Sequence, residues 1–346
     1  MFSSRPKPLH QLCGRPMIRY ILDAVAHDDV VATVIVVGYG AQSVEKEVRQ
    51  QLPSGEHLTF VDQAQQLGTG HAVLEALPTI NHEIGTTDGD VLIVPGDAPL
   101  LRASTVRELL TRHRDDQSAL TVLSALVEDP FGYGRIVRSK DGAIVRIVEE
   151  RDASADERAI SEINTSIMVV RASLLGPALR RVDRKNAQHE YLLTDLVAVL
   201  HEAGHATKAM VLRDPFEAAG VNNRAQLATA EAALRLRINE GWMQRGVTMW
   251  DPSCTYIDAD VQLSPDVSLL PGTVLKGHCE VQRGAQIGPN AFLTDVIVGE
   301  NAHVAMVEAT NVRVGDDARV HSFAVLGPGV VVARETHVAP FENRTH

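Results

Sequence analysis

The most constraining feature of the sequence is an aliphatic side chain that recurs every six residues through the C-terminal part of the chain. Fourteen positions follow this pattern: Ile257, Leu263, Leu269, Leu275, Val281, Ile287 and Leu293, then Val298 and Val304, then Val314, Val320, Leu326, Val332 and Val338. The register is interrupted before Val298 and again before Val314. A six-residue repeat with glycines at the turns is typical of a parallel β-helix, in which each coil buries its interior against its neighbours. We therefore predict a partial hexapeptide β-helix over residues 251–346.

The first two thirds of the chain show a different pattern. Apolar runs at residues 31–37, 58–61 and 91–94 predict buried strands, and apolar residues at helical spacing predict helices at 16–26 and 41–51. Strands that alternate with helices indicate an α/β domain with a parallel core, which we place at residues 1–222. Residues 223–246 are predicted to form one long helix, either a linker between the two halves or an ordinary surface helix.

Composition narrows the classes of partner. The chain of 346 residues carries 44 acidic and 33 basic residues, a formal net charge of −11, and only 4% aromatic residues. An acidic surface with few aromatic side chains argues against nucleic acid as a partner. The three cysteines are far apart, as expected of packed thiols in a reducing compartment. No apolar run approaches the roughly 18 residues of a membrane span, so we expect a cytoplasmic protein.

A carboxylate follows one of the predicted strands. The apolar run at residues 91–94 ends in Pro95-Gly96-Asp97, and ligands of open α/β sheets bind beyond the carboxyl ends of the strands. A hard cation such as Mg²⁺ takes one or two carboxylates together with phosphate oxygens. Asp97 is therefore a candidate metal ligand, although on this stretch alone it could equally cap the next helix or begin a turn.

Other polar residues at strand ends are weaker candidates when taken singly. Lys7, fixed between Pro6 and Pro8, could face a phosphate or be a solvated charge. Gln63 precedes Gly68-Thr69-Gly70, and its amide suits the edge of a nucleobase, but a polar loop without a ligand is the simpler interpretation.

The remaining candidates are Glu149, Asn164 and Asn222, each of which could also be a solvated charge or a turn residue. The sequence has neither the spacing of a nucleophilic triad nor a His/Cys metal cluster. Binding and positioning of a ligand are therefore favoured over covalent catalysis.

Taken together, short motifs make a family resemblance specific. The sequence resembles the bacterial bifunctional N-acetylglucosamine-1-phosphate uridyltransferase/glucosamine-1-phosphate acetyltransferase family over essentially the whole printed chain, though not over the whole family protein. The motifs that carry the resemblance are Pro6-Lys7-Pro8-Leu9-His10, Gln66-Leu67-Gly68-Thr69-Gly70-His71-Ala72, Gly96-Asp97, Gly132-Tyr133-Gly134-Arg135-Ile136, Ile147-Val148-Glu149, Glu162-Ile163-Asn164-Thr165, Asn186-Ala187-Gln188 and Gly220-Val221-Asn222-Asn223-Arg224.

The resemblance implies a fold, a reaction and a set of site residues. The fold would be a Rossmann-like α/β nucleotidyltransferase domain, a helical arm and a left-handed parallel β-helix that usually forms homotrimers. The reaction would join UTP to N-acetylglucosamine 1-phosphate with Mg²⁺, giving UDP-N-acetylglucosamine and pyrophosphate. The implied roles are phosphate binding by Lys7, uracil recognition by Gln63, nucleoside contacts by Gly68 and Thr69, Mg²⁺ ligation by Asp97 and Asn222, and N-acetylglucosamine contacts by Gly134, Glu149 and Asn164.

Two departures from the family pattern bear on activity. The family begins with a strand and a glycine-rich loop that wraps the triphosphate, and the printed chain starts where that loop would end. Pro95 stands where the family commonly carries a hydroxyl-bearing residue near the sugar. These departures leave open a catalytically impaired sugar-nucleotide-binding or scaffold protein, or another sugar-1-phosphate nucleotidyltransferase.

We expect no acetyltransferase activity from the printed chain. In the family that site lies in later coils and needs an arginine near the motif written here as Phe323-Ala324-Val325-Leu326-Gly327-Pro328-Gly329, which contains none. His321 and His337 are accordingly interpreted as surface residues of the β-helix. The measurement is acetyl-CoA consumption with glucosamine 1-phosphate, and robust turnover would refute the expectation.

Overall fold

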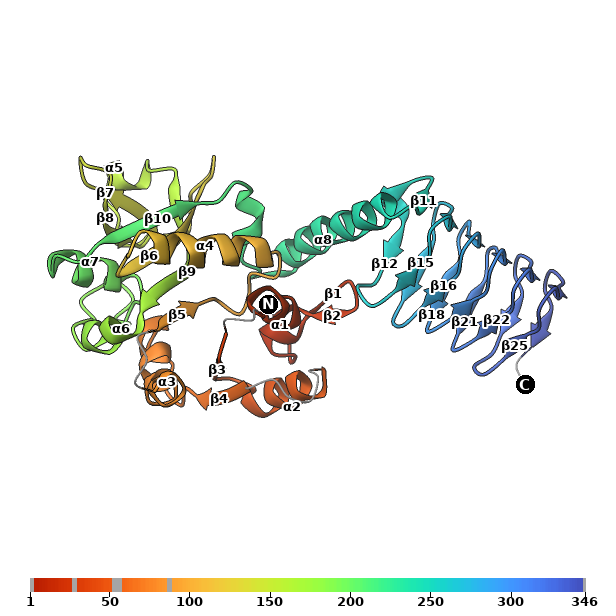
Figure 1. Ribbon diagram of the computed structural model, residues 1–346, viewed down its shortest axis with the longest axis horizontal. Coiled ribbons are helices and arrows are strands. Elements are labelled where there is room, and N and C mark those ends of the chain that lie inside the picture. The colour runs from red at the N-terminus through yellow and green to blue at the C-terminus, as the bar shows by residue number, and fades with distance from the viewer. Residues whose placement is uncertain (1–2, 27–29, 52–57, 86–88, 345–346) are drawn as a thin grey trace. The chain divides into compact units, whose positions relative to one another are not determined.

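The computed structural model describes residues 3–26, 30–51, 58–85 and 89–344, and Figure 1 gives the labels of the elements. The chain divides into two compact units. The first comprises Met1–His10 and Met17–Asn223, and the second comprises Gln11–Pro16 and Arg224–His346. The short segment Gln11–Pro16 thus belongs to the C-terminal unit, which nothing in the sequence indicated. The finer division at residues 222, 246 and 251 stays a prediction.

The first unit alternates strands and helices. Its elements are η1 (Lys7–Leu9), α1 (Met17–Val25), β3 (Thr33–Val37), α2 (Ala41–Gln51), β4 (Leu58–Asp62), α3 (Thr69–Ile84), β5 (Asp90–Ile93), α4 (Ala103–Asp115), β6 (Leu120–Leu126), β7 (Arg135–Arg138), β8 (Ile144–Val148), α5 (Ala155–Arg158), β9 (Glu162–Arg171), α6 (Ala172–Leu179), α7 (Asp195–Glu202), β10 (Thr207–Val211) and η2 (Pro215–Ala218).

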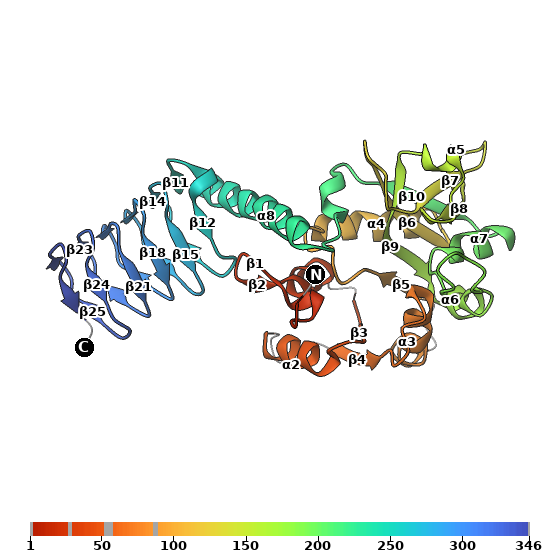
Figure 2. The ribbon, with the colours of Figure 1, turned by 180° about the vertical axis from the view of Figure 1, so that it is seen from behind.

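The sheet of this unit is mixed rather than parallel. Its strands run in the order β10-β6-β9-β7-β8, with β5 joined to β9. β10 and β6 are parallel, whereas β9 is antiparallel to both β5 and β6. The expected parallel core is therefore wrong for β5, because its partner among the described strands comes from a later, antiparallel segment. β3 and β4 form a separate parallel pair, which Figure 2 shows apart from the larger sheet.

Both faces of the larger sheet are covered. Along β9, Met168 and Val170 contribute to one apolar cluster, and Ile167 and Val169 contribute to the other. This alternation follows from the two-residue period of a strand. Helices α6 and α7 complete the first cluster, while α4 packs across β6 and β9 on the second (Figure 1). A strand buried on both faces explains why residues 167–170 of β9 are continuously hydrophobic.

The second unit begins with a hairpin and a long helix and continues as short strands. Its elements are β1 (Gln11–Leu12), β2 (Arg15–Pro16), α8 (Arg224–Gln244), β11 (Thr248–Met249), η3 (Pro252–Cys254), β12 (Tyr256–Ile257), β13 (Gln262–Leu263), β14 (Ser268–Leu269), β15 (Val274–Lys276), β16 (Glu280–Val281), β17 (Gln286–Ile287), β18 (Phe292–Thr294), β19 (Ile297–Val298), β20 (His303–Val304), β21 (Glu308–Thr310), β22 (Arg313–Val314), β23 (Arg319–Val320), β24 (Val325–Leu326), β25 (Val331–Val332), β26 (His337–Val338) and β27 (Asn343–Arg344).

These strands stack into three parallel sheets, of six, six and five strands. Each strand pairs with the strand three further along the chain, so that Leu275 lies beside Leu293 and Val298 beside Val314. The six-residue positions point inward and form one continuous apolar cluster. The C-terminal unit is a left-handed parallel β-helix, as predicted, and its coils succeed one another from β11 to the blue end of the ribbon in Figure 1.

The interruption of the repeat has a simple structural cause. The spacing shrinks from six residues to five between Leu293 and Val298, between Val304 and Ala309, and between Ala309 and Val314. Ala309, on β21, is 2% exposed and fills the inward position that the pattern appeared to skip. Alanine is too small to stand out in a hydrophobic pattern, so the sequence suggested a gap where the coil is only slightly shorter.

The β-helix interior gives a stability prediction. Leu293 is fully buried, so Leu293→Ala should lower the free energy of unfolding of this unit by about 2–5 kcal/mol through lost burial and a cavity. The matched control, Val331→Ala, removes a side chain that is 66% exposed and should change it by no more than about 0.5 kcal/mol. Both tryptophans, Trp242 and Trp250, lie in this unit, so their fluorescence in guanidinium reports its unfolding. Equal effects of the two substitutions would contradict the assigned interior.

Candidate active site

Three residues that are far apart in the sequence converge in the first unit. The Lys7 ammonium donates a short hydrogen bond to Asp97 Oδ2, with which it forms an ion pair, and another of 2.6 Å to Asn222 Oδ1. The side chains of Lys7 and Asp97 are 36% and 26% exposed, so the cluster is reachable from solvent. The structure therefore brings together the residue predicted to bind phosphate and the two predicted to bind metal.

Local structure explains why these side chains meet. Lys7 lies in η1, where Pro6 restricts the backbone entering the turn. Asp97 follows β5, and its carbonyl accepts a hydrogen bond of 2.9 Å from the Val221 amide, which holds the chain next to Asn222. A methyl group on Gly220 would lie 3.8 Å from both the Asn222 amide nitrogen and an Asp97 carboxylate oxygen. Gly220 thus lies beside both side chains, at ordinary van der Waals distance.

The chemistry of this cluster suits a hard divalent cation. One cation, the Lys7 ammonium, already contacts a carboxylate oxygen and an amide oxygen together, so these oxygens converge on a shared point. Carboxylate and amide oxygens are the donors that such cations prefer. The described residues contain no group of three or more His, Cys, Asp or Glu able to hold a metal. A metal held by Asp97 and Asn222 would need further oxygens from a ligand, as a nucleotide supplies.

A second group of predicted residues surrounds the start of α3. Gln63 Nε2 lies 3.1 Å from the Gly68 carbonyl, to which it donates, and 3.0 Å from His71 Nδ1. Gly68 has φ +111°, and a methyl group there would lie 2.5 Å from the Tyr191 carbonyl oxygen. Only glycine fits this position, because an L side chain would be strained and would also collide with backbone. The glycine is needed for the close approach of two backbone segments.

Residues 191–194, which we call the 191–194 segment, connect this group to the next. The Tyr191 amide donates to the Leu67 carbonyl at 2.8 Å, and the Gly70 amide donates to the Tyr191 carbonyl at 2.7 Å. The Leu193 amide donates to Thr69 Oγ1 at 3.0 Å. One residue later, Thr194 Oγ1 donates to Glu149 Oε1 at 3.0 Å.

The third group contains Gly134, Glu149 and Asn164. The backbone amide of Asn164 donates to the Gly134 carbonyl at 2.8 Å, and a methyl group on Gly134 would lie 3.4 Å from Glu149 Oε2. The structure thus places the three residues predicted to contact the sugar side by side. The register between β6 and β9 shifts between Leu123 and Ser124, so Asn164 lies at an irregularity of the kind that redirects side chains beside binding sites.

Burial alters the acidity of this third group. Desolvation raises the pKa of Glu149, while the hydrogen bond from Thr194 opposes that rise. Desolvation, with contributions from Asp183, Glu149 and Asp152, raises the pKa of Asp195 to about 6. Both effects have the same cause, since a carboxylate out of water loses solvation of its charged form.

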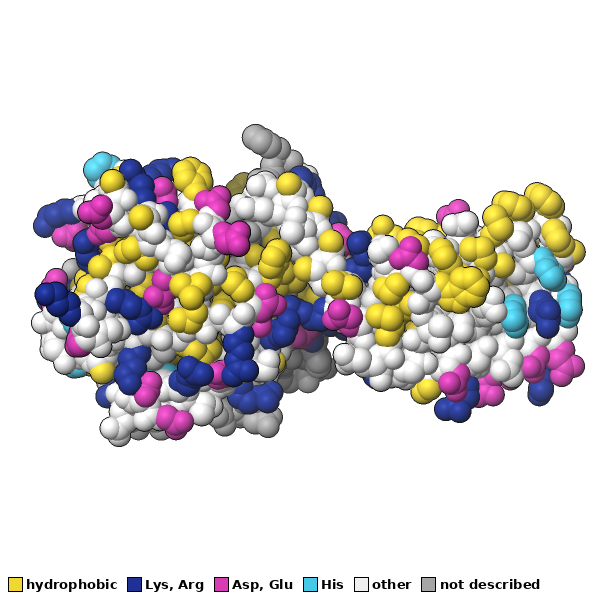
Figure 3. Space-filling view, turned by 90° about the horizontal axis from the view of Figure 1, so that it is seen from above, with side chains coloured by type: hydrophobic (Ala, Val, Ile, Leu, Met, Phe, Trp, Pro, Cys, Tyr) yellow, Lys and Arg dark blue, Asp and Glu magenta, His cyan; other side chains and the backbone are white. Residues whose placement is uncertain are grey.

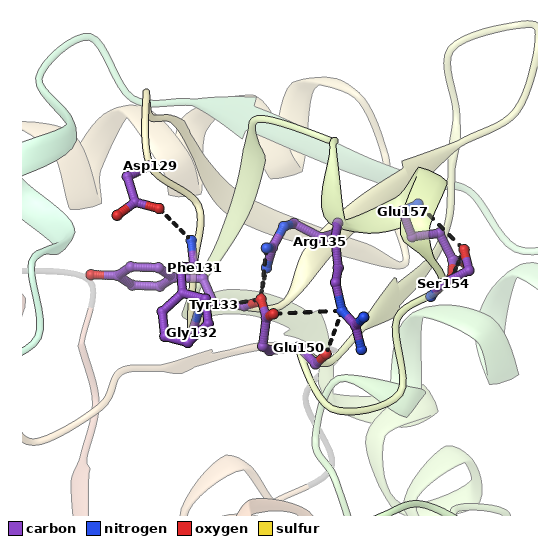
Figure 4. A network of polar contacts seen from close by, with 9 residues as sticks. Asp129, Phe131, Gly132, Tyr133, Arg135, Glu150, Ser154 and Glu157 are labelled. Carbon is purple, nitrogen blue, oxygen red and sulfur yellow. Dashed lines mark hydrogen bonds and ion pairs between the residues drawn. The ribbon is translucent and has the colours of Figure 1, made fainter.

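The glycine-rich turn beside Gly134 is held by an ionic network (Figure 4). Arg135, 1% exposed, donates to Glu150 Oε2 at 2.7 Å and to the Tyr133 carbonyl, and the Gly132 amide donates to the same Glu150 oxygen at 3.2 Å. These hydrogen bonds, that of Arg135 foremost, hold the pKa of Glu150 below its ordinary value. Glu149 and Glu150 follow the end of β8, and the carboxylate of Glu149 accepts from Thr194 while that of Glu150 holds the turn.

Sequence reasoning missed the supporting residues. Thr194 and Glu150 belong to no motif whose spacing reveals their role, and Arg135 was noted only as part of a glycine-rich run. The two consecutive glutamates at the end of a predicted strand are the one signal of a supporting role, because consecutive residues of a strand point to opposite faces.

Comparison with known proteins identifies the class of protein. The profile of the MobA-like NTP transferase domain matches residues 2–187, more than half of the chain. The first unit therefore contains a nucleotidyltransferase domain.

Close relatives identify the family. The bifunctional protein GlmU of Brevibacillus brevis is 41% identical over 341 residues, which cover 99% of this chain and 72% of that protein. GlmU of Desulfitobacterium hafniense is 39% identical, with 99% and 73% covered, and GlmU of Caldanaerobacter subterraneus is 38% identical, with 96% and 70% covered. The chain belongs to the family of bifunctional GlmU proteins. Among the described residues, none of the helices has the length and apolar character needed to cross a bilayer.

The Glu150 network gives a pH-dependent prediction. Because the folded pKa of Glu150 is depressed below 4.5, its ionic contribution to stability should be present at neutral pH and fade as the pH falls through the folded pKa. Glu150→Gln should therefore lower the melting temperature at pH 7, and the gap to the parent protein should narrow well below pH 4.5. Far-UV circular dichroism measures both, and the exposed Glu128→Gln is the control. A gap that is the same at both pH values would count against the network.

Proposed function

We propose that the protein transfers a uridylyl group from UTP to N-acetylglucosamine 1-phosphate. A phosphate oxygen of the sugar phosphate forms a bond to the α-phosphorus of UTP, the bond from that phosphorus to the β-phosphate oxygen breaks, and pyrophosphate leaves. The observation that carries the proposal is the convergence of Lys7, Asp97 and Asn222 on one cation position. Such a reaction needs alignment and charge neutralisation rather than a protein nucleophile.

Asp97 and Asn222 are proposed as the protein ligands of Mg²⁺, with phosphate oxygens completing its shell. When bound, the metal neutralises charge on the phosphates as it develops during transfer. The Lys7 ammonium contacts both of these side chains, so a metal placed between them would displace it. The freed ammonium would then be beside the phosphates, where it can bind the departing negative charge.

The nucleoside would lie on the glycine turn before α3. The contacts of Gln63 Nε2 with the Gly68 carbonyl and His71 restrict the orientation of the amide, which leaves its oxygen to accept from the edge of uracil. Gly68, without a side chain, allows close approach of the backbone. The hydroxyl of Thr69 already accepts from the Leu193 amide, and it can still donate its own proton to a ligand.

The sugar would lie against Gly134, Glu149 and Asn164. An ionised Glu149 accepts hydrogen bonds from sugar hydroxyls or from an acetamido N–H, and the Asn164 amide offers both a donor and an acceptor. The 191–194 segment contacts both the turn at Gly68 and Thr69 and the carboxylate of Glu149. These contacts support two neighbouring subsites, one for the nucleoside and one for the sugar, that are both held by the 191–194 segment.

The β-helix is proposed to associate as a homotrimer, as the family does. Several hydrophobic side chains on its outer surface are exposed, among them Phe323 and Phe341, whose rings stack with centroids 5.1 Å apart. Figure 3 shows hydrophobic side chains gathered on one face of this unit. Exposed apolar surface of this kind is typical of protein–protein contacts, and sedimentation equilibrium of the full chain measures the state.

The proposed reaction is tested by pyrophosphate release from UTP and N-acetylglucosamine 1-phosphate with Mg²⁺. Asp97→Asn should lower the rate about 100-fold or more, because it removes a charged ligand where negative charge develops. It should also weaken Mn²⁺ binding measured by electron paramagnetic resonance in the presence of UTP. The control, Asp115→Asn, changes an exposed carboxylate on α4.

Release of pyrophosphate with a different base or sugar phosphate would indicate another sugar-1-phosphate nucleotidyltransferase. Sugar-nucleotide binding without any turnover would favour the impaired scaffold protein. If Asp97→Asn left both the rate and Mn²⁺ binding unchanged, Asp97 would not be a ligand of the metal.

A further inference from the structure

We propose that Thr194 is a positioning residue for Glu149, whose carboxylate it orients to bind the sugar phosphate. The inference rests on the proposed function, since it assigns to Glu149 the recognition of the sugar. It adds a residue that does not itself contact substrate but acts through one that does.

The geometry singles out Thr194. It occupies the N-cap position of α7, where a threonine side chain ordinarily accepts a hydrogen bond from the helix backbone. Here the side chain makes no capping hydrogen bond, and its hydroxyl instead donates to Glu149 Oε1 at 3.0 Å. Thr194 is only 6% exposed, so water cannot readily replace it as the donor.

The environment of Glu149 makes the hydrogen bond from the Thr194 hydroxyl important. Burial disfavours its ionised form, the negative charge of Asp152 adds to that effect, and the charges of Glu149 and Asp195 act on each other. Within the described part of the chain, Thr194 supplies the hydrogen bond that opposes both effects. A neutral carboxyl would present a hydroxyl to the ligand at one oxygen and lose its strength as an acceptor.

Backbone contacts fix the direction of the carboxylate. Gly134 lies so close that a methyl group there would be 3.4 Å from Oε2 and 3.5 Å from Oε1 of Glu149. Thr194 is itself fixed, because the adjoining Leu193 amide is bonded to Thr69 and the Tyr191 amide to Leu67. One oxygen of Glu149 is thus taken by a rigidly held donor, while the other makes no contact with Thr194 and both lie beside Gly134.

The kinetic experiment compares Thr194→Val, which removes the hydroxyl at similar volume, with Thr194→Ser, which keeps it. In Thr194→Val, KM for N-acetylglucosamine 1-phosphate should rise about 10-fold or more, because a hydrogen bond to a charged group is lost. KM for UTP should be almost unchanged. The acid limb of kcat/KM for the sugar phosphate should move to higher pH, since Glu149 is then protonated more easily. Thr194→Ser should restore both values.

A second readout does not depend on turnover. Glutamate labelled with ¹³C at the side-chain carboxyl allows the titration of Glu149 to be followed by NMR in the ligand-free protein, with Glu149→Gln assigning the signal. Thr194→Val should raise the pKa of Glu149, and Thr194→Ser should leave it as in the parent protein.

The two readouts separate the possible failures. An unchanged Glu149 titration in Thr194→Val, or an equal rise of KM for both substrates, would overturn the role of Thr194. A shifted titration in a protein that releases no pyrophosphate from these substrates would support the positioning of Glu149 and refute the proposed reaction instead.

Discussion

The candidate site depends on one ionic contact, in which the Lys7 ammonium lies between the Asp97 carboxylate and the Asn222 amide oxygen. The contact joins residues separated by 90 and 215 positions in the chain. A partly solvated pair of this kind contributes little to stability, so its importance lies in geometry rather than in energy. It shows that the start of the unit, the end of β5 and the end of the unit share one position suited to a cation.

Around that contact, rigidity comes from backbone hydrogen bonds together with the hydroxyl groups of Thr69 and Thr194. The turn at Gly68, the carboxylate of Glu149 and the turn at Gly134 are connected through the 191–194 segment and through the amide of Asn164. Backbone amides cannot rotate away as long side chains can, so they hold ligand-binding groups at little entropic cost. This arrangement suits a transfer reaction whose rate depends on alignment of two substrates.

Much of the fold was predictable because hydrophobic periodicity reports burial directly. The six-residue repeat predicted the β-helix, and only Ala309 escaped it, since a methyl group gives a weak signal. In the first unit the elements were predicted well but their partners were not. The antiparallel pairing of β5 with β9 depends on which later segment returns to the sheet, and no local pattern encodes that choice.

By itself, the sequence determined the strands at residues 31–37, 58–61 and 91–94 and the coils of the β-helix, because each follows from local spacing and backbone preference. It also supplied the candidate residues, through motifs shared with a family. Only the tertiary structure decided which of them meet: Lys7 with Asp97 and Asn222, and Glu149 with a threonine that no motif marked. The physical reason is that hydrogen bonds and ion pairs act over a few ångströms of space, whereas sequence patterns record only neighbours along the chain.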